Sequence, residues 1–132
     1  MVLVSATPYF PAQARTIMSQ YADGMSEQQW EILRLRHPGG DAQINALLAS
    51  TKAFATSYDD MNFTSPYLST IQARTLIVQG DCDPLYPVEI SVEMARAIRQ
   101  CSLWIIPNSG HGPVIGDRWP EFVKTAAAFL QE

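Results

Sequence analysis

The chain has 132 residues, of which 47% are hydrophobic and 17% charged, and its formal net charge at pH 7 is -4. This length suits one globular domain and is too short for two domains of ordinary size. The mildly acidic charge, without runs of like charges, argues against a surface that binds nucleic acid or an anionic membrane.

The cysteines and the first residues bear on the cellular location. Cys82 and Cys101 are too few for a disulfide framework, so we expect reduced thiols and a cytoplasmic protein. The apolar start, Met1 to Ala6, has no basic segment before it and is far shorter than the roughly 18 residues of a membrane span. Because the chain begins on strand-like residues with nothing before them to pair with, the sequence predicts a truncated gene product.

The first half predicts one strand followed by helices. Residues 2–7 are a short β-branched run closed by a proline, which is typical of a buried strand in a parallel sheet. From residue 11 to about residue 62 the apolar positions take helical spacings interrupted by Gly and Pro, so three or four short helices are expected. Ser26 with Gln29 predicts a helix-start capping pair, and Asp41 follows two glycines where an N-cap is expected.

The second half predicts alternating strands and helices. Apolar runs at residues 74–79 and 102–106 read as strands, a helix is expected to start near Pro87, and a last helix runs from about Pro120 to the chain end. Continuous apolar strands that alternate with helices indicate an α/β protein with a parallel sheet.

Each of these two strands leads into a loop with reactive side chains. The first is followed by Gly80-Asp81-Cys82-Asp83, and the second by Gly110-His111-Gly112. The carboxyl ends of parallel strands meet at one edge of a sheet, so we expect these loops to converge. A catalytic histidine needs a carboxylate to hold its tautomer, and Asp83 and His111 fit these two roles.

The order strand, Gly-Asp-x-Asp-x-x-x-Pro, helix, strand, Pro-x-x-Gly-His and closing helix resembles the C-terminal half of an α/β-hydrolase, over about Thr75 to Leu130. The resemblance implies a partial α/β-hydrolase fold, with about three parallel strands and flanking helices formed by residues 1–10 and 67–132. It also implies a helical cap inserted at residues 11–66. Asp83 then matches the triad acid, His111 the triad base and Asp81 the other acidic position, which is commonly structural. No metal or organic cofactor is implied.

The nucleophile of such enzymes is missing from the pattern. The family places it on a Gly-x-Ser-x-Gly type elbow before the acid and the histidine. No serine here has glycines two residues away on both sides, and Ser109 is too close to His111 to occupy the elbow. Cys82 is a possible substitute, but we expect it to point away along its loop. The resemblance therefore predicts ester or acyl hydrolysis in a complete enzyme and an inactive chain in isolation.

Alternatives remain open at this point. The chain could be a non-catalytic binding or assembly module, or one half of a split hydrolase whose nucleophile comes from another polypeptide. The expected partners are a small-molecule substrate or ligand, without nucleic acid or membrane. The apolar first strand also predicts a homo-oligomer formed through its exposed edge, or the binding of a separate N-terminal chain. His37 is expected to be a loop residue.

Overall fold

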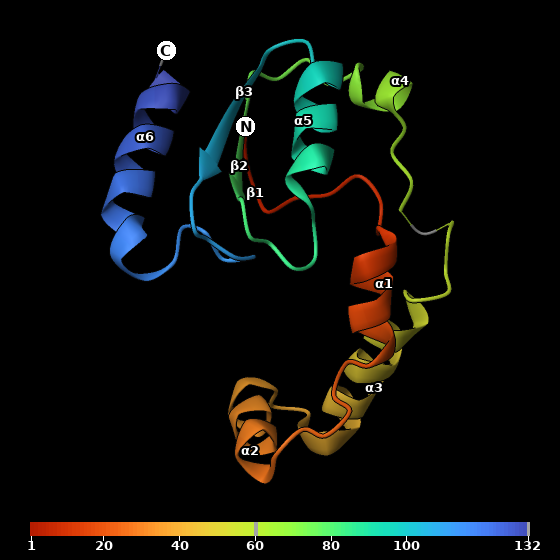
Figure 1. Ribbon diagram of the computed structural model, residues 1–132. Coiled ribbons are helices and arrows are strands. Elements are labelled where there is room, and N and C mark those ends of the chain that lie inside the picture. Colours follow the sequence, from red (N-terminus) through yellow and green to blue (C-terminus); the bar gives the residue numbers. More distant parts are fainter. Residues whose placement is uncertain (60, 132) are drawn as a thin grey trace. The chain divides into compact units, whose positions relative to one another are not determined.

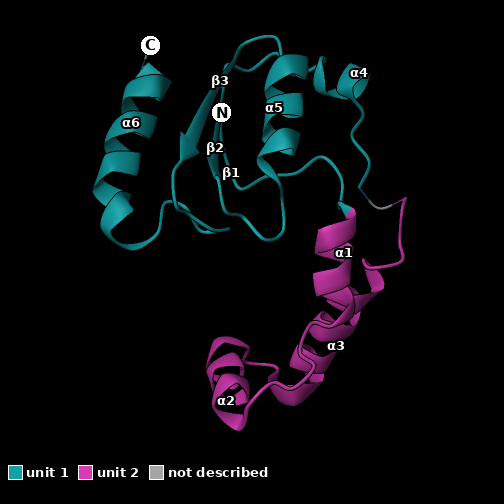
Figure 2. Ribbon diagram, viewed as in Figure 1, with its two compact units in different colours: residues 1–11, 61–132 teal, residues 12–60 magenta. Residues whose placement is uncertain are grey.

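A computed structural model of the chain describes residues 1–59 and 61–131 (Figure 1). The chain forms two compact units, coloured separately in Figure 2. Unit 1 combines Met1–Pro11 with Met61–Glu132, and unit 2 is the segment Ala12–Asp60.

Unit 1 is built on a parallel sheet. Its strands are β1 (Val2–Val4), β2 (Thr75–Gly80) and β3 (Cys101–Ile106), in the order β1-β2-β3. Val4 is level with Val78, and Val78 is level with Trp104 on the other side. Every residue of β2 is buried, as its uninterrupted apolar run predicts for a central strand. The predicted parallel sheet is thereby confirmed.

The first strand is shorter than expected. The sequence predicted residues 2–7, but β1 ends at Val4, because Ser5 adopts a left-handed backbone conformation with φ 47°. A strand cannot continue through a residue with positive φ. Ser5 still donates its backbone N–H to the Val78 carbonyl oxygen at 2.9 Å, so the chain leaves the sheet directly after it.

Helices cover both faces of this sheet (Figure 1). Helix α5 (Val88–Ala97) packs on one face, where Ile77 meets Ile90 and Met94. Helix α6 (Trp119–Gln131) lies on the other face, where Phe122 and Phe129 pack against a cluster that contains Val78. Two apolar clusters with β2 between them form the core of the unit. Pro87 is the N-cap of α5 rather than part of its first turn, with ψ 149°.

Unit 2 contains α1 (Ala12–Ser19), α2 (Glu27–Arg36) and α3 (Gly40–Ala53). The predicted capping box of Ser26 and Gln29 is present at the start of α2. The prediction that Asp41 is an N-cap is wrong. Asp41 lies inside the first turn of α3, whose N-cap is Gly39, because Gly40 with φ 60° already opens the helix. Buried Arg15 donates to the carbonyl oxygens of Phe54 and Ser57, which satisfies groups at the C-terminal end of α3.

The chain segments of unit 1 that lead into and out of unit 2 are hydrogen-bonded to each other. Tyr9 and Asn62 form an isolated antiparallel bridge, and Phe63 donates its backbone N–H to the Pro8 carbonyl oxygen at 2.9 Å. The short helix α4 (Ser65–Leu68) follows. Residues 61–66, which the sequence placed with the cap, therefore group with the sheet. Among residues 1–59 and 61–131, no helix has both the length and the apolar character needed to cross a membrane.

Candidate active site

The loop after β2 holds Asp83 in a tight turn. The backbone N–H groups of Leu85 and Tyr86 donate to Asp83 Oδ1 at 2.8 and 3.1 Å. Asp side chains favour this local bonding to residues two or three positions ahead. The side chain of Asp83 is fully buried, with an exposed fraction of 0%. The turn thus fixes one oxygen of the carboxylate and leaves the other for a distant partner.

The loop after β3 folds across the end of β2. Asp81 donates its backbone N–H to the Ile106 carbonyl oxygen at 3.2 Å, and Cys82 donates to the Ser109 carbonyl oxygen at 2.9 Å. In return, Ser109 donates its N–H to Asp81 Oδ1 at 3.1 Å. Asp81 therefore joins the two loops. The backbone N–H groups of Ser109 and Asn108 hold the pKa of the Asp81 carboxyl below its usual value.

Asp83 and His111 meet as the sequence predicted they would. The distance from Asp83 Oδ2 to His111 Nδ1 is 3.0 Å, within hydrogen-bond reach. The imidazole is 44% exposed, while its partner carboxylate is buried. Tyr86 presents its ring edge-on to the imidazole, with the two ring centres 5.2 Å apart. An acid at Nδ1 leaves Nε2 as the ring nitrogen that can take up a proton.

Opposing effects act on the ionisation of Asp83. Burial alone would raise the pKa of its carboxyl group. Hydrogen bonds from His111, Tyr86, Leu85 and Gln79 outweigh burial, and the pKa lies below its ordinary value. Asp83 is therefore a carboxylate at neutral pH, the form that accepts a hydrogen bond from imidazole.

A nucleophile beside His111 is not found in the part of the chain that the structure describes. Within residues 1–59 and 61–131, Asp83 is the only hydrogen-bond partner of the imidazole. Cys82 is exposed, and its hydrogen bond to Asp81 raises the pKa of the thiol, which disfavours the reactive thiolate. His37 lies in unit 2, directly after α2, and donates its backbone N–H to the Leu33 carbonyl oxygen.

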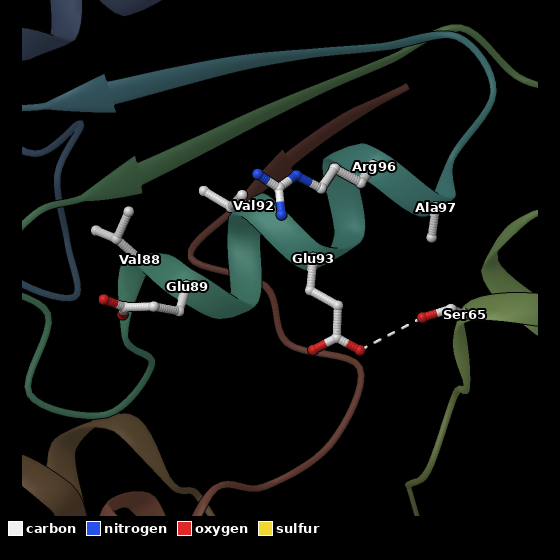
Figure 3. A pocket seen from close by; sticks show the side chains of 7 residues that line it. All are labelled: Ser65, Val88, Glu89, Val92, Glu93, Arg96 and Ala97. Atoms are coloured by element: carbon white, nitrogen blue, oxygen red, sulfur yellow. Dashed lines mark hydrogen bonds between the residues drawn. The ribbon is translucent and has the colours of Figure 1, made fainter.

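Other features of the described residues do not extend this site. A hollow of about 520 Å³ lies along α5, between that helix and Ser65 (Figure 3). Its polar wall includes Glu93, which accepts hydrogen bonds from Tyr9 at 3.1 Å and from Ser65 at 3.4 Å. Neither Asp83 nor His111 lines it. In the described ranges, no three His, Cys, Asp or Glu side chains gather in a way that could hold a metal ion.

The sequence analysis did not single out Gln79 and predicted no role for Gly80. Gln79 is a buried polar side chain in β2 that reaches Asp83, and Gly80 lies where the histidine loop crosses the strand. Gln79 interrupts the apolar run of β2 just before the reactive loop. A polar residue at that position was the signal in the sequence that could have identified Gln79 as part of the site.

The parallel sheet, its covering helices and the paired acid and histidine at one sheet edge define the class: this is a partial α/β-hydrolase fold. Residues 42–132 match the family described as TAP-like protein. The chain therefore belongs to this family of α/β-hydrolases. No curated protein matches it.

Solved structures with the same fold are distant in sequence. The meta-cleavage product hydrolase CumD from Pseudomonas fluorescens IP01 is 15% identical with a TM-score of 0.60, over 99% of this chain and 55% of that one. An α/β-hydrolase from a Medee basin deep-sea metagenome library is 16% identical with a TM-score of 0.67, over 100% and 56%. The esterase RhEst1 from Rhodococcus sp. ECU1013 is 14% identical with a TM-score of 0.61, over 99% and 55%. The present chain thus spans about 55% of the length of these proteins.

Proposed function

We propose that Asp83 and His111 are the acid and the base of a hydrolase triad that acts on ester or acyl substrates. The observation that supports this most strongly is the 3.0 Å contact between a buried carboxylate and a partly exposed imidazole. In this role Asp83 accepts the Nδ1 proton and stabilises the imidazolium, while Nε2 takes a proton from the nucleophile and later returns it to the leaving group. The substrate is a small molecule.

We further propose that the nucleophile is not among the residues of this chain, so that the isolated chain is inactive. Acyl transfer needs a nucleophile and donors for the oxyanion in addition to a base. His111 has only Asp83 as a hydrogen-bond partner among the described residues, and no serine here stands on a Gly-x-Ser-x-Gly elbow.

Unit 2, residues 12–60, is proposed as the cap that selects the substrate. A cytoplasmic location remains a prediction from the two free cysteines, Cys82 and Cys101.

A split hydrolase is the proposed alternative to an inactive remnant or a non-catalytic module. The chain covers only about 55% of the structures that share its fold. In a split enzyme, a second polypeptide would supply the nucleophile. In a split enzyme, Asp83 and His111 would keep their roles as acid and base.

An ester hydrolysis assay tests this proposal. The purified chain is expected to hydrolyse short-chain aryl esters no faster than its His111→Ala variant, because neither contains the nucleophile. A His37→Ala variant, which loses the other histidine, is the matched control. Turnover by the unaltered chain that is lost in His111→Ala but kept in His37→Ala would contradict the proposal and assign a working nucleophile to this chain.

We also propose that β1 pairs with a further strand, from a second copy or from a separate N-terminal chain. Among the described strands, β1 pairs with β2 alone, so the backbone groups on its other edge have no strand partner. Since Ser5 donates its N–H to Val78 in β2, strand alternation directs the N–H of Val4 toward that free edge.

Sedimentation velocity at micromolar concentration tests this association. The unaltered chain is expected to sediment as a dimer or larger species. The Val4→Pro variant removes an outward N–H donor without removing a bond to β2, and it is expected to shift the chain toward the monomer. A stable monomer observed for the unaltered chain would rule out self-association through this edge.

A further inference from the structure

Gln79 is a polar residue buried at the end of the central strand. It is the fifth residue of the all-buried strand β2, and its exposed fraction is 0%. The register places it level with Ile105 of β3. A polar side chain in such a position must find its hydrogen bonds inside the protein. Its partners therefore indicate why this strand contains an amide.

Three acceptors surround the amide nitrogen of Gln79. Nε2 lies 2.8 Å from Asp83 Oδ2, 3.0 Å from the Tyr86 carbonyl oxygen and 3.4 Å from the Gly80 carbonyl oxygen. The reversed amide would direct its oxygen at a carboxylate, so these neighbours fix the orientation. The amide oxygen Oε1 is then buried without a hydrogen-bond partner among the described residues. An unpaired buried carbonyl is unfavourable, and the fold accepts it here in order to direct two N–H groups at the acid loop.

Gln79 and His111 share one oxygen of the acid. Asp83 Oδ2 has Gln79 Nε2 at 2.8 Å and His111 Nδ1 at 3.0 Å, while the backbone N–H groups of the turn occupy Oδ1. These donors define the plane of the carboxylate. The same amide also binds the carbonyl of Tyr86, whose ring packs edge-on against His111. One side chain thus holds both groups that face the imidazole.

We propose that Gln79 is a positioning residue that orients the Asp83 carboxylate and the Tyr86 ring toward His111, so that the neutral imidazole keeps its proton on Nδ1. This rests on the proposed function of Asp83 and His111 as acid and base. Gln79 itself does not touch the reacting atoms. It acts on the tautomer of the histidine, because the hydrogen bond between Nδ1 and Asp83 decides which ring nitrogen bears the proton.

The test is the ¹⁵N spectrum of the histidine rings, since the shifts of Nδ1 and Nε2 report which nitrogen bears the proton. Gln79→Met has a side chain of similar length without a donor. We expect the ratio of the Nδ1–H to the Nε2–H form of His111 to fall by roughly 2- to 12-fold in this variant, the factor that corresponds to one hydrogen bond. His37, in unit 2, serves as an internal reference and is expected to keep its spectrum.

A matched control separates positioning from general destabilisation. Thr75 is also fully buried in β2, at the other end of the strand, and its hydroxyl donates to the Ala73 carbonyl oxygen at 2.8 Å. The Thr75→Val variant removes the side-chain hydrogen bond of a buried residue in the same strand. It is expected to leave the tautomer of His111 unchanged. A change equal to that of Gln79→Met would contradict a specific role for Gln79.

The outcomes distinguish this inference from the function on which it rests. If His111 of the unaltered chain holds its proton on Nε2, the proposed pairing with Asp83 fails, and the role of Gln79 fails with it. If the unaltered chain shows the Nδ1–H form and Gln79→Met shows it to the same extent, only the inference about Gln79 is overturned.

A second measurement needs no variant and applies even if Gln79→Met does not fold. The side-chain N–H resonances of Gln79 are followed as His111 is titrated with acid. Gln79 Nε2 and His111 Nδ1 share Asp83 Oδ2 as their partner. The Gln79 resonances are therefore expected to shift with the same midpoint as those of the imidazole. Gln72, an exposed glutamine that donates to the Thr70 carbonyl oxygen, is the reference and is expected not to follow this midpoint. Gln79 resonances that ignore the titration of His111 would overturn the inference.

Discussion

Replacing Gly80 by alanine is expected to destabilise unit 1 by at least about 2 kcal/mol, because overpacking a close contact costs about 1–3 kcal/mol and occasionally more. A Cβ atom at Gly80 would lie 2.7 Å from the carbonyl carbon of Ser109 and closer still to the carbonyl oxygens of Ser109 and Gly110. These are backbone atoms of the loop that leads to His111, so they cannot turn away as a side chain would. The loop must move or the strand must distort.

The measurement for Gly80→Ala is thermal unfolding followed by circular dichroism. For a chain of this length, each kcal/mol lowers the unfolding midpoint by roughly 2–8 °C. Gly110→Ala is the matched control, since a Cβ there meets nothing within 4 Å. A midpoint for Gly80→Ala equal to that of Gly110→Ala would show that the two loops do not cross as described.

Removing the carboxylate of Asp83 is the second change with a large expected effect. In Asp83→Ala, the backbone N–H groups of Leu85 and Tyr86, together with one contact of Gln79, lose their acceptor. Each buried donor left unpaired costs about 1–3 kcal/mol, so a loss of roughly 3 kcal/mol is expected at pH 7. Urea unfolding measures it. Asp117→Ala, at an exposed aspartate, is the control and is expected to change stability by less than about 0.5 kcal/mol.

The effect of Asp83 depends on pH in a defined direction. Its pKa in the folded chain is below the ordinary value of about 3.9, so the unfolded chain binds more protons between the two pKa values. The stabilisation is therefore complete above about pH 4 and disappears as the pH falls through the lowered pKa of the folded state. The stability difference between the unaltered chain and Asp83→Ala is expected to shrink on acidification. A difference that is constant from pH 7 to strong acid would mean that folding does not lower the pKa of Asp83.

The sequence predicted the features that depend on local rules. The continuous apolar runs predicted β2 and β3 with a parallel arrangement, and that arrangement predicted the meeting of Asp83 with His111 at one sheet edge. The capping box at Ser26 was predicted because its chemistry lies within one helical turn.

What the sequence did not predict depends on contacts between distant segments or on single backbone angles. Gln79 was not singled out because its role requires the loop to return Asp83 and Tyr86 to the strand. The end of β1 and the start of α3 depended on positive φ angles, at Ser5 and Gly40. A positive φ angle at a serine cannot be predicted from the residue type. In a pair of successive glycines, the residue type does not indicate which one begins the helix.

A double-mutant cycle on Asp83 and His111 tests most directly the central claim that these two side chains act as one pair. The free energy of unfolding is measured at pH 7 for the unaltered chain, Asp83→Ala, His111→Ala and the double variant. Residues joined by a hydrogen bond show coupling energies of about 0.5–3 kcal/mol, and we predict a value in this range. Losses that add to within about 0.3–0.5 kcal/mol, as for independent sites, would contradict the pairing.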